Sequence, residues 1–439
     1  MLRNCRNVFM KNNICPIFIQ KKNFLTKEYK CTDAWNSMNS SPVFDKIIIH
    51  DFYNILDQNY SSKGVISAID VDMFANAIKD PSHLEELKDL LHKLRTTAET
   101  GNMLDSTHQA TIRHFLEFGD VKELIEILKD PLNYGVFLDY YTANMLLDKL
   151  ITISDFELAA RVASLVMLQE EYNNEITCTL CQYACYKYIS SYTPPPPEQP
   201  PAEKSKKVEE IKIRVKYLRN PYFDDHFDIN DTLTLSGKTL AWISERASNN
   251  LDNNLQLIGW LIYKKYDKLS VFCEKISNDK SFKVYKEVVE LVQKAHDAAE
   301  AEIMPTLENV LSTLGKIEQN SDALEKSLEV AIENAINKSH NNDVSQQKQL
   351  FQSWAKLRDE KLEEQAQRLD RARRIQVIQQ KQNELKDQEQ KLWFFENEDK
   401  IDLQIEEKEQ LVDKSTVKKT ATKISEDNYI PPEIVPKRK

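Results

Sequence analysis

Three cysteines stand close together in the middle of the chain, with the spacing C-x2-C-x3-C: Cys178, Cys181 and Cys185. Thiolates at such spacings bind zinc, but a zinc site needs a fourth ligand, which usually comes from a second cluster. The remaining cysteines are scattered singly: Cys5, Cys15, Cys31 and Cys273. We therefore interpret the three clustered thiols as apolar side chains on one face of a buried helix, and we predict no metal site.

No other residues have the types and spacing of an active site. The eight histidines are isolated, and the two nearest each other, His108 and His114, have no acidic or thiol partner at a catalytic spacing. The sequence also lacks the glycine-rich dinucleotide and Walker motifs, H-E-x-x-H and G-x-S-x-G. We predict a protein that is not an enzyme and that uses no cofactor and no small-molecule substrate.

Two basic groups have the chemistry to bind phosphate. The first consists of four arginines: Arg368, Arg371, Arg373 and Arg374. On a helix Arg371 and Arg374 share a face, and the guanidinium fork matches the geometry of a phosphate. The alternative is a solvated helix face on which these arginines pair with Glu363, Glu364 and Asp370.

The second basic group, Lys204, Lys206 and Lys207, follows six prolines between positions 194 and 201. That proline density excludes a helix and predicts an exposed polyproline loop, from which the lysines could reach phosphates. The whole chain is acidic, with 59 basic and 69 acidic residues and a net charge of −10. RNA contact must therefore use local patches, and it should weaken with salt.

The elements that position these residues are predicted to be helices. Only seven of the 439 residues are glycine, whereas glycine supplies the turns of β-hairpins and of phosphate-binding loops. No apolar run is long enough to span a membrane as a helix. We predict an all-α fold.

A repeat of 35 residues organises the centre of the chain, because Thr107, Thr142 and Thr177 are evenly spaced. Each of the first two units reads as two amphipathic helices around a short turn, at positions 119–120 and 154–155. The third unit is interrupted by the proline run, so its second helix must come later. Such hairpins cannot bury their apolar faces alone, and they stack into an α-solenoid.

The predicted order of parts follows from these patterns. Residues 1–27 carry six basic and no acidic side chains, as in a mitochondrial presequence, although a merely basic, disordered N-terminus is the alternative. The parts are a mitochondrial presequence (1–30), helical-hairpin repeats (45–192), a proline-rich basic loop (193–210), a divergent helical-hairpin region (211–280), a C-terminal helical, coiled-coil-like region (281–414) and a disordered basic tail (415–439).

The C-terminal region carries a thin apolar stripe, typical of an exposed long helix or a coiled-coil seam. The stripe includes Leu350, Trp354, Leu357, Leu362, Leu369 and Ile375. Further along, Trp393, Phe394 and Phe395 form an aromatic cluster among polar residues. This cluster is either a docking site or packs locally against its own chain.

The second repeat is similar to the pentatricopeptide pattern T-Y-N-x-L-I followed by G-x-x-x-x-A, through residues 141–146 and 154–159. Residues 133–139 (NYGVFLD), running into 142–148 (TANMLLD), resemble the core of the mitochondrial small-ribosomal-subunit protein twenty-seven family, which is of pentatricopeptide type. The resemblance implies a non-catalytic part of the mitochondrial ribosome in the matrix. Such a protein binds small-subunit ribosomal RNA and neighbouring small-subunit proteins, and it supports mitochondrial translation.

In pentatricopeptide proteins that read RNA, two positions per repeat contact a base. By motif match these would be Gln109 with Asp139, and Asn144 with Asn174. The chain has few repeats, an interrupted third unit and Ala143 in place of an aromatic residue, so contacts by shape and phosphate are expected rather than base reading. Two rival functions remain: a free mitochondrial RNA-binding factor for messenger RNA stability or translation, and a tetratricopeptide-like adaptor that holds a peptide.

Overall fold

The computed structural model describes residues 23–193 and 223–421, apart from 280 and 302. Within these ranges every regular element is helical, which confirms the all-α prediction, and one isolated parallel bridge joins Val284 to Gln319. None of the described helices is long and apolar enough to cross a membrane. The chain divides into two compact units, with the boundary after Asp359.

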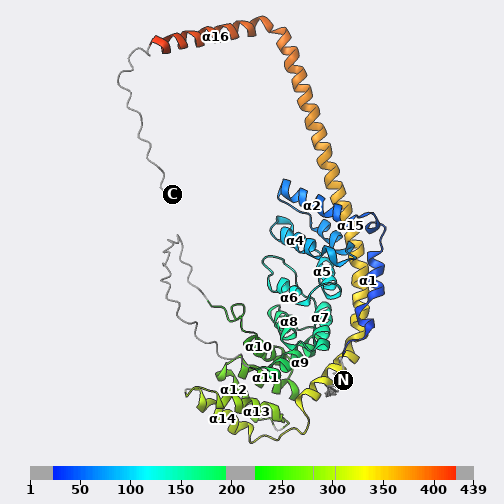
Figure 1. Ribbon diagram of the computed structural model, residues 1–439, viewed down its shortest axis with the longest axis vertical. Coiled ribbons are helices and arrows are strands. Elements are labelled where there is room, and N and C mark those ends of the chain that lie inside the picture. The colour runs from blue at the N-terminus through cyan, green and yellow to red at the C-terminus, as the bar shows by residue number, and fades with distance from the viewer. Residues whose placement is uncertain (1–22, 194–222, 280, 302, 422–439) are drawn as a thin grey trace, which may run out of the picture. The chain divides into compact units, whose positions relative to one another are not determined.

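Most helices belong to the first unit, and Figure 1 shows them following one another in chain order. They are α1 (Thr32–Asn39), α2 (Ile49–Lys63), α3 (Ala68–Ala77), α4 (Leu84–Arg95), α5 (Asp105–Glu117), α6 (Val121–Lys129), α7 (Tyr140–Ile153), α8 (Phe156–Leu168), α9 (Glu175–Ser191), α10 (Thr232–Glu245), α11 (Asn250–Ile262), α12 (Tyr266–Ser277), α13 (Lys286–Asp297) and α14 (Met304–Leu314). Four 3-10 turns lie between them: η1 (Lys27–Lys30), η2 (Phe44–Lys46), η3 (Pro81–His83) and η4 (Ala98–Asn102).

The helix α15 (Leu324–Glu396) runs from the first unit into the second, and α16 (Glu398–Ala421) belongs to the second unit. A long C-terminal helix is therefore confirmed. The sequence predicts that a disordered tail begins at position 415, whereas α16 continues to Ala421. The remaining tail residues lie outside the described range.

Consecutive helices of the first unit pack as pairs, α3 with α4, α5 with α6, α7 with α8, and α9 with α10. Helices also contact the equivalent helix of the next pair, as α5 does α7 and α8 does α10. The helix α10 packs on both α8 and α9 although residues 192–231 separate it from α9. It is the delayed second helix that the interrupted third repeat requires.

The repeated threonines mark helix starts. In α7 the backbone N–H of Thr142 donates to Asp139 Oδ1 at 3.0 Å, and the Thr142 hydroxyl completes a capping box. In α9 the backbone N–H of Thr177 donates to Asn174 Oδ1 at 3.0 Å. Each such cap satisfies backbone donors that the helix leaves free and contributes about 1 kcal/mol. The 35 residues between Thr142 and Thr177 are thus the spacing of two capped helix N-termini. The helix α5, which carries Thr107, begins without a side-chain cap, and Thr107 instead donates its hydroxyl to Asp72.

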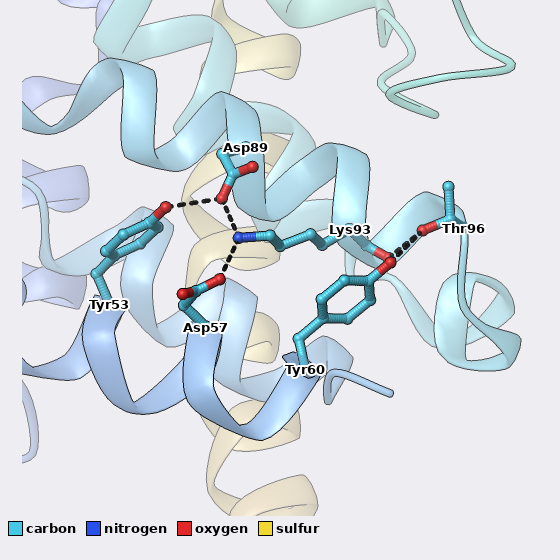
Figure 2. A network of polar contacts seen from close by, with 6 residues as sticks. All are labelled: Tyr53, Asp57, Tyr60, Asp89, Lys93 and Thr96. Atoms are coloured by element: carbon cyan, nitrogen blue, oxygen red, sulfur yellow. Dashed lines mark hydrogen bonds and ion pairs between the residues drawn. The ribbon is translucent and has the colours of Figure 1, made fainter. Parts of the chain in front are cut away.

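At the N-terminal end of the hairpins a polar network joins α2 to α4, as Figure 2 shows. Its members are Tyr53, Asp57, Tyr60, Asp89, Lys93 and Thr96. Lys93 Nζ lies 2.6 Å from Asp57 Oδ1 and also bonds Asp89, which accepts from the Tyr53 hydroxyl at 2.8 Å. Burial acts to lower the pKa of Lys93, but the hydrogen bonds to Asp57 and Asp89 outweigh it and raise that pKa, so the cation persists and fixes the pair.

The segment that follows residue 22 is part of the first unit. The backbone N–H groups of Phe24 and Leu25 donate to Asp148 Oδ1 of α7 at 2.9 and 3.1 Å, and the Tyr29 ring is fully buried. A presequence extending to position 30 would take these packed residues with it. Residues 1–22, which hold most of the predicted presequence, lie outside the described range.

The helices α10 and α11 approach each other closely at Gly237 and Gly259, where no side chain stands between them. A Cβ on Gly259 would lie 2.7 Å from Ala241 Cα, whereas one on Gly101 would meet nothing. Gly259→Ala should lower the free energy of unfolding by about 1–3 kcal/mol, because backbone atoms cannot yield as side chains do. Gly101→Ala is the control in urea denaturation, and equal stability of the two variants would refute the close approach.

A second prediction concerns pH. His114 of α5 is buried with Nε2 2.9 Å from the carbonyl oxygen of Ala75, and burial lowers its pKa to about 4. The unfolded chain, with a histidine pKa near ~6.5, takes up this proton first, so stability is lost as pH falls from about 6.5 to about 4. Between pH 7 and pH 4.5 wild type should lose about 2 kcal/mol more than His114→Gln; equal losses in denaturation curves would contradict this.

Candidate RNA-binding positions on the inner helices

The four residues matched to base-reading positions lie on or cap the first helices of successive pairs, and we call these first helices the inner helices. Gln109 belongs to α5 and Asn144 to α7, while Asp139 and Asn174 are the N-caps of α7 and α9. Gln109 Nε2 donates to Asp139 Oδ2 at 2.9 Å, and Asn144 Nδ2 lies 3.5 Å from Asn174 Oδ1. The structure therefore brings together the same two pairs that the motif match names.

These side chains nevertheless face their own chain. Gln109 is 2 % exposed and Asn144 is fully buried. Gln347 of α15 donates through Nε2 to Gln109 Oε1 at 3.2 Å, and Asn174 Nδ2 donates to Asp343 Oδ2 of α15 at 2.9 Å. The amide groups that would hydrogen-bond a base thus bond a helix of the same protein.

The N-terminal segment takes part in the same contacts. The Tyr29 hydroxyl donates to Asp343 Oδ2 at 3.2 Å and lies 2.9 Å from Asn144 Nδ2, which donates to it. Burial is the main cause of the raised pKa of Tyr29, so this phenol stays protonated and keeps its donor role. Asn144 is linked to α15 through Tyr29 rather than directly.

The last of these contacts along α15 is an ion pair with α3. Arg358 Nε of α15 donates to Asp72 Oδ2 of α3 at 2.7 Å, with side chains only 4 % and 0 % exposed. The other carboxylate oxygen of Asp72 accepts from the Thr107 hydroxyl at 2.9 Å and from Asn76 Nδ2 at 3.0 Å. We call Asp72, Gln109, Asp139, Asn144 and Asn174 the polar row.

The side chains of α15 that contact the polar row recur at a regular helical spacing. The buried residues of α15 beyond position 340 are Asp343, Gln347, Phe351, Trp354 and Arg358. Steps of three and four residues keep these side chains on one helix face. Of the apolar stripe predicted from the sequence only Trp354 is buried, whereas Leu350, Leu357, Leu369 and Ile375 are exposed. Of the two predicted alternatives, the exposed long helix agrees with these exposures, and a coiled-coil seam stays a prediction. Phe351 and Trp354 nevertheless pack in the apolar core, with the ring centres of Trp35 and Phe351 5.5 Å apart.

Aromatic rings from α1, α7 and α15 surround the guanidinium group of Arg113. The Arg113 guanidinium of α5 lies 4.7 Å from the Trp35 ring centre, 5.4 Å from that of Phe351 and 5.6 Å from that of Tyr141. It also donates to the carbonyl oxygen of Lys30 at 2.9 Å. Cation–π contacts of this kind strengthen when water is excluded, so α1, α5, α7 and α15 are tied through one cation.

The polar row is also electrostatically unsuited to phosphate. Asp72 and Asp139 belong to it, Asp343 faces it from α15, and the half-buried Arg113 and the buried Arg358 are already engaged. Base reading by Gln109, Asp139, Asn144 and Asn174 stays a prediction, and it requires residues 343–358 of α15 to leave.

The arginine group has the opposite character. Arg368, Arg371, Arg373 and Arg374 lie in the part of α15 that belongs to the second unit, and all are exposed. Arg374 Nε donates only within its own helix, to the carbonyl oxygen of Asp370 at 3.3 Å. Within the described range no ion pair is formed between these arginines and Glu363, Glu364 or Asp370. The lysines at 204, 206 and 207 lie outside the described residues.

The three clustered cysteines lie on α9 and are buried. Burial raises the pKa of Cys178 to about 11 and raises those of Cys181 and Cys185 as well. Raised pKa values keep the thiols protonated and apolar, in agreement with the interpretation as core side chains. No group of histidine, cysteine and acidic residues able to hold a metal ion occurs in the residues that the structure describes.

Sequence reasoning missed Asp72 of the polar row and the side chains that bond to the row, which are Tyr29, Asp343, Gln347 and Arg358. The last three are spaced so that they share a helix face, and a polar residue repeating among buried aromatics is the signal that could have found them.

The sequence also matches the model of a known protein family. The model of the family described as mitochondrial 28S ribosomal protein S27 matches residues 1–384.

The buried ion pair yields a prediction. Arg358→Met leaves the Asp72 carboxylate buried without its cation and should cost about 3–5 kcal/mol of unfolding free energy. The double variant Asp72→Asn/Arg358→Met should recover most of this loss, because no unpaired charge stays buried. Urea denaturation followed by tryptophan fluorescence measures both, since Trp35 and Trp354 lie in the first unit.

The exposed Arg373→Met is the matched control and should change stability by no more than about 0.5 kcal/mol. Asp72→Asn alone completes the cycle. A double variant that loses as much as the two single variants together would show that Arg358 and Asp72 are not coupled.

Proposed function

Because this chain belongs to the mitochondrial 28S ribosomal protein S27 family, we propose that it is a structural, RNA-binding constituent of the small subunit of the mitochondrial ribosome. It supports mitochondrial translation in the matrix, without catalysing a reaction. Its partners are the small-subunit ribosomal RNA and neighbouring small-subunit proteins. The family match carries this proposal, and the charge distribution of the described residues indicates which part contacts RNA.

The exposed arginines of α15 are the RNA-binding group in this proposal. Their guanidinium groups lie on a solvated helix and form no ion pair among the described residues. Arginine binds phosphate through two parallel hydrogen bonds. The acidic chain as a whole would not attract RNA, so this patch must act locally. Contacts to phosphate position a protein on RNA without reading sequence.

The helical hairpins serve as the scaffold. Their polar row is engaged by α15, whose residues 343–358 cover it. The hairpins thus hold a helix, in line with the tetratricopeptide-like alternative, but that helix belongs to the same chain. We propose that the outer surfaces of the hairpins fit against their neighbours by shape, and that the inner residues keep α15 in place.

Sedimentation tests the proposal directly. In a gradient of mitochondrial lysate at high salt with magnesium, the protein should travel with the small ribosomal subunit. A free RNA-binding factor or an adaptor would leave the subunit under these conditions. Migration of the whole pool as a free protein of about the chain's own mass, 51.1 kDa, would overturn the ribosomal assignment.

The role of the arginines is tested separately with the full-length chain and a transcript of the small-subunit ribosomal RNA. Arg371→Gln/Arg374→Gln removes two cations from one helix face and should reduce the slope of log affinity against log salt by up to ~1.8, at up to ~0.9 per phosphate. The control Lys400→Gln/Lys408→Gln removes two cations that lie among acidic residues and should leave the slope unchanged. Equal slopes for wild type and the arginine variant would refute phosphate binding by this patch.

A further inference from the structure

The described helices of the second unit carry two segments of opposite charge. Residues 368–381 contain five basic residues and one acidic residue, whereas residues 384–413 contain eleven acidic and four basic residues. The first segment holds the arginines assigned above to RNA. The second repels phosphate over its whole length, so RNA cannot be its ligand.

Four large apolar side chains stand in a row within the acidic segment. Leu392, Trp393, Phe394 and Phe395 close the last turn of α15, and their exposed fractions are 69 %, 59 %, 40 % and 70 %. Phe394 and Phe395 contact each other edge to face, with ring centres 6.0 Å apart. Tryptophan and phenylalanine clusters of this kind are enriched at the centres of protein interfaces and are unusual on free surfaces.

The consecutive positions determine the shape of what can cover them. Each residue turns an α-helix by about 100°, so four in a row point to nearly all sides of the helix. A flat surface or a single partner helix covers only one stripe of the helix surface, about 100° wide. Burial of all four side chains therefore needs a concave pocket that wraps the end of α15.

The charges around the row determine the chemistry of that pocket. Glu389, Glu396, Glu398 and Asp399 flank the aromatic residues within about two helix turns. A pocket that closes over them must bring cations, because buried unpaired carboxylates are costly. Anionic lipid and nucleic acid are excluded on the same ground.

We propose that residues 389–399 form a docking site for a protein whose apolar pocket is rimmed by lysine and arginine. The inference rests on the proposed function, in which that protein is another constituent of the same ribosomal subunit. The RNA-facing and protein-facing parts of the second unit are then adjacent segments, distinguished by charge. The aromatic cluster of this segment lies beyond the range matched by the family model, which ends at residue 384.

Site-specific photo-crosslinking tests the docking site in the complete chain. Benzoylphenylalanine replaces Trp393, and as a matched control it replaces Val377, which is similarly exposed at 51 % in the basic segment. Small subunits that have incorporated either protein are irradiated, and the adducts are identified by mass spectrometry. We expect the probe at 393 to form an adduct with a lysine- or arginine-rich site of one protein, and the probe at 377 to form none with that site.

A charge reversal supplies the second readout. Glu398→Lys/Asp399→Lys should lower the adduct yield at position 393 at least tenfold, because the added cations face the basic rim. An adduct with ribosomal RNA, with an acidic protein site or with this chain alone would overturn the inference. So would the absence of any adduct at 393, or a yield unaffected by the reversal.

The two proposals fail in different ways. If the unmodified chain does not sediment with the small subunit, the proposed function itself is wrong. If it does, and the probe at 393 nevertheless meets RNA or nothing, only the docking site is wrong. The probe at 377 tests whether the photochemistry works in particles of the same kind, since it lies in the segment assigned to RNA.

Discussion

The first unit depends on one requirement, namely that buried polar groups find partners. Gln109, Asn144 and Asp72 lie on the inner helices with almost no exposed surface, and an unpaired buried amide or carboxylate costs several kcal/mol. The chain meets most of this cost with its own α15. Gln347 donates to Gln109, Arg358 donates to Asp72, and Asp343 is linked to Asn144 through Tyr29. Without α15 the polar row would need water or another polar ligand.

This requirement also joins the N-terminal and C-terminal parts of the first unit that the structure describes. Tyr29 lies between Asn144 and Asp343, and Arg113 is enclosed by Trp35, Tyr141 and Phe351. Residues more than 300 positions apart in sequence therefore share contacts. We expect contacts of such sequence separation to form after the hairpins, because closing so long a loop costs conformational entropy that only ordered hairpins offset.

This packing of α15 on the hairpins separates two roles that the proposed function assigns to the chain, the scaffold and the RNA contact. The motif match places RNA contacts on the inner helices, yet here these helices hold α15. Exposed charge instead lies along α15 and α16 in the second unit, where basic and acidic segments follow each other. In our proposal a helical scaffold holds one part of α15, and the rest of that helix is free to meet other molecules.

The sequence by itself determined the helical class, the helix starts and the hairpin order. These follow from local rules, because a cap such as Asp139 with Thr142 involves neighbours in the chain and the apolar period reports one helix at a time. The family resemblance was likewise readable from a short segment, and the match over residues 1–384 confirms it. The two residue pairs named by the motif match also lie within hydrogen-bond distance of each other, at 2.9 and 3.5 Å, while base reading by them stays a prediction.

Only the tertiary structure decided what those positions face. A glutamine at 109 has the same local pattern whether it binds a base or Gln347, and nothing near it in sequence names a partner 238 positions away. The thin apolar stripe of the C-terminal helix did not indicate which face is buried, because that face combines Phe351 and Trp354 with polar residues that bond to α3, to α5 and to the N-cap of α9. Partner choice between distant segments is a property of packing in three dimensions, and local periodicity does not encode it.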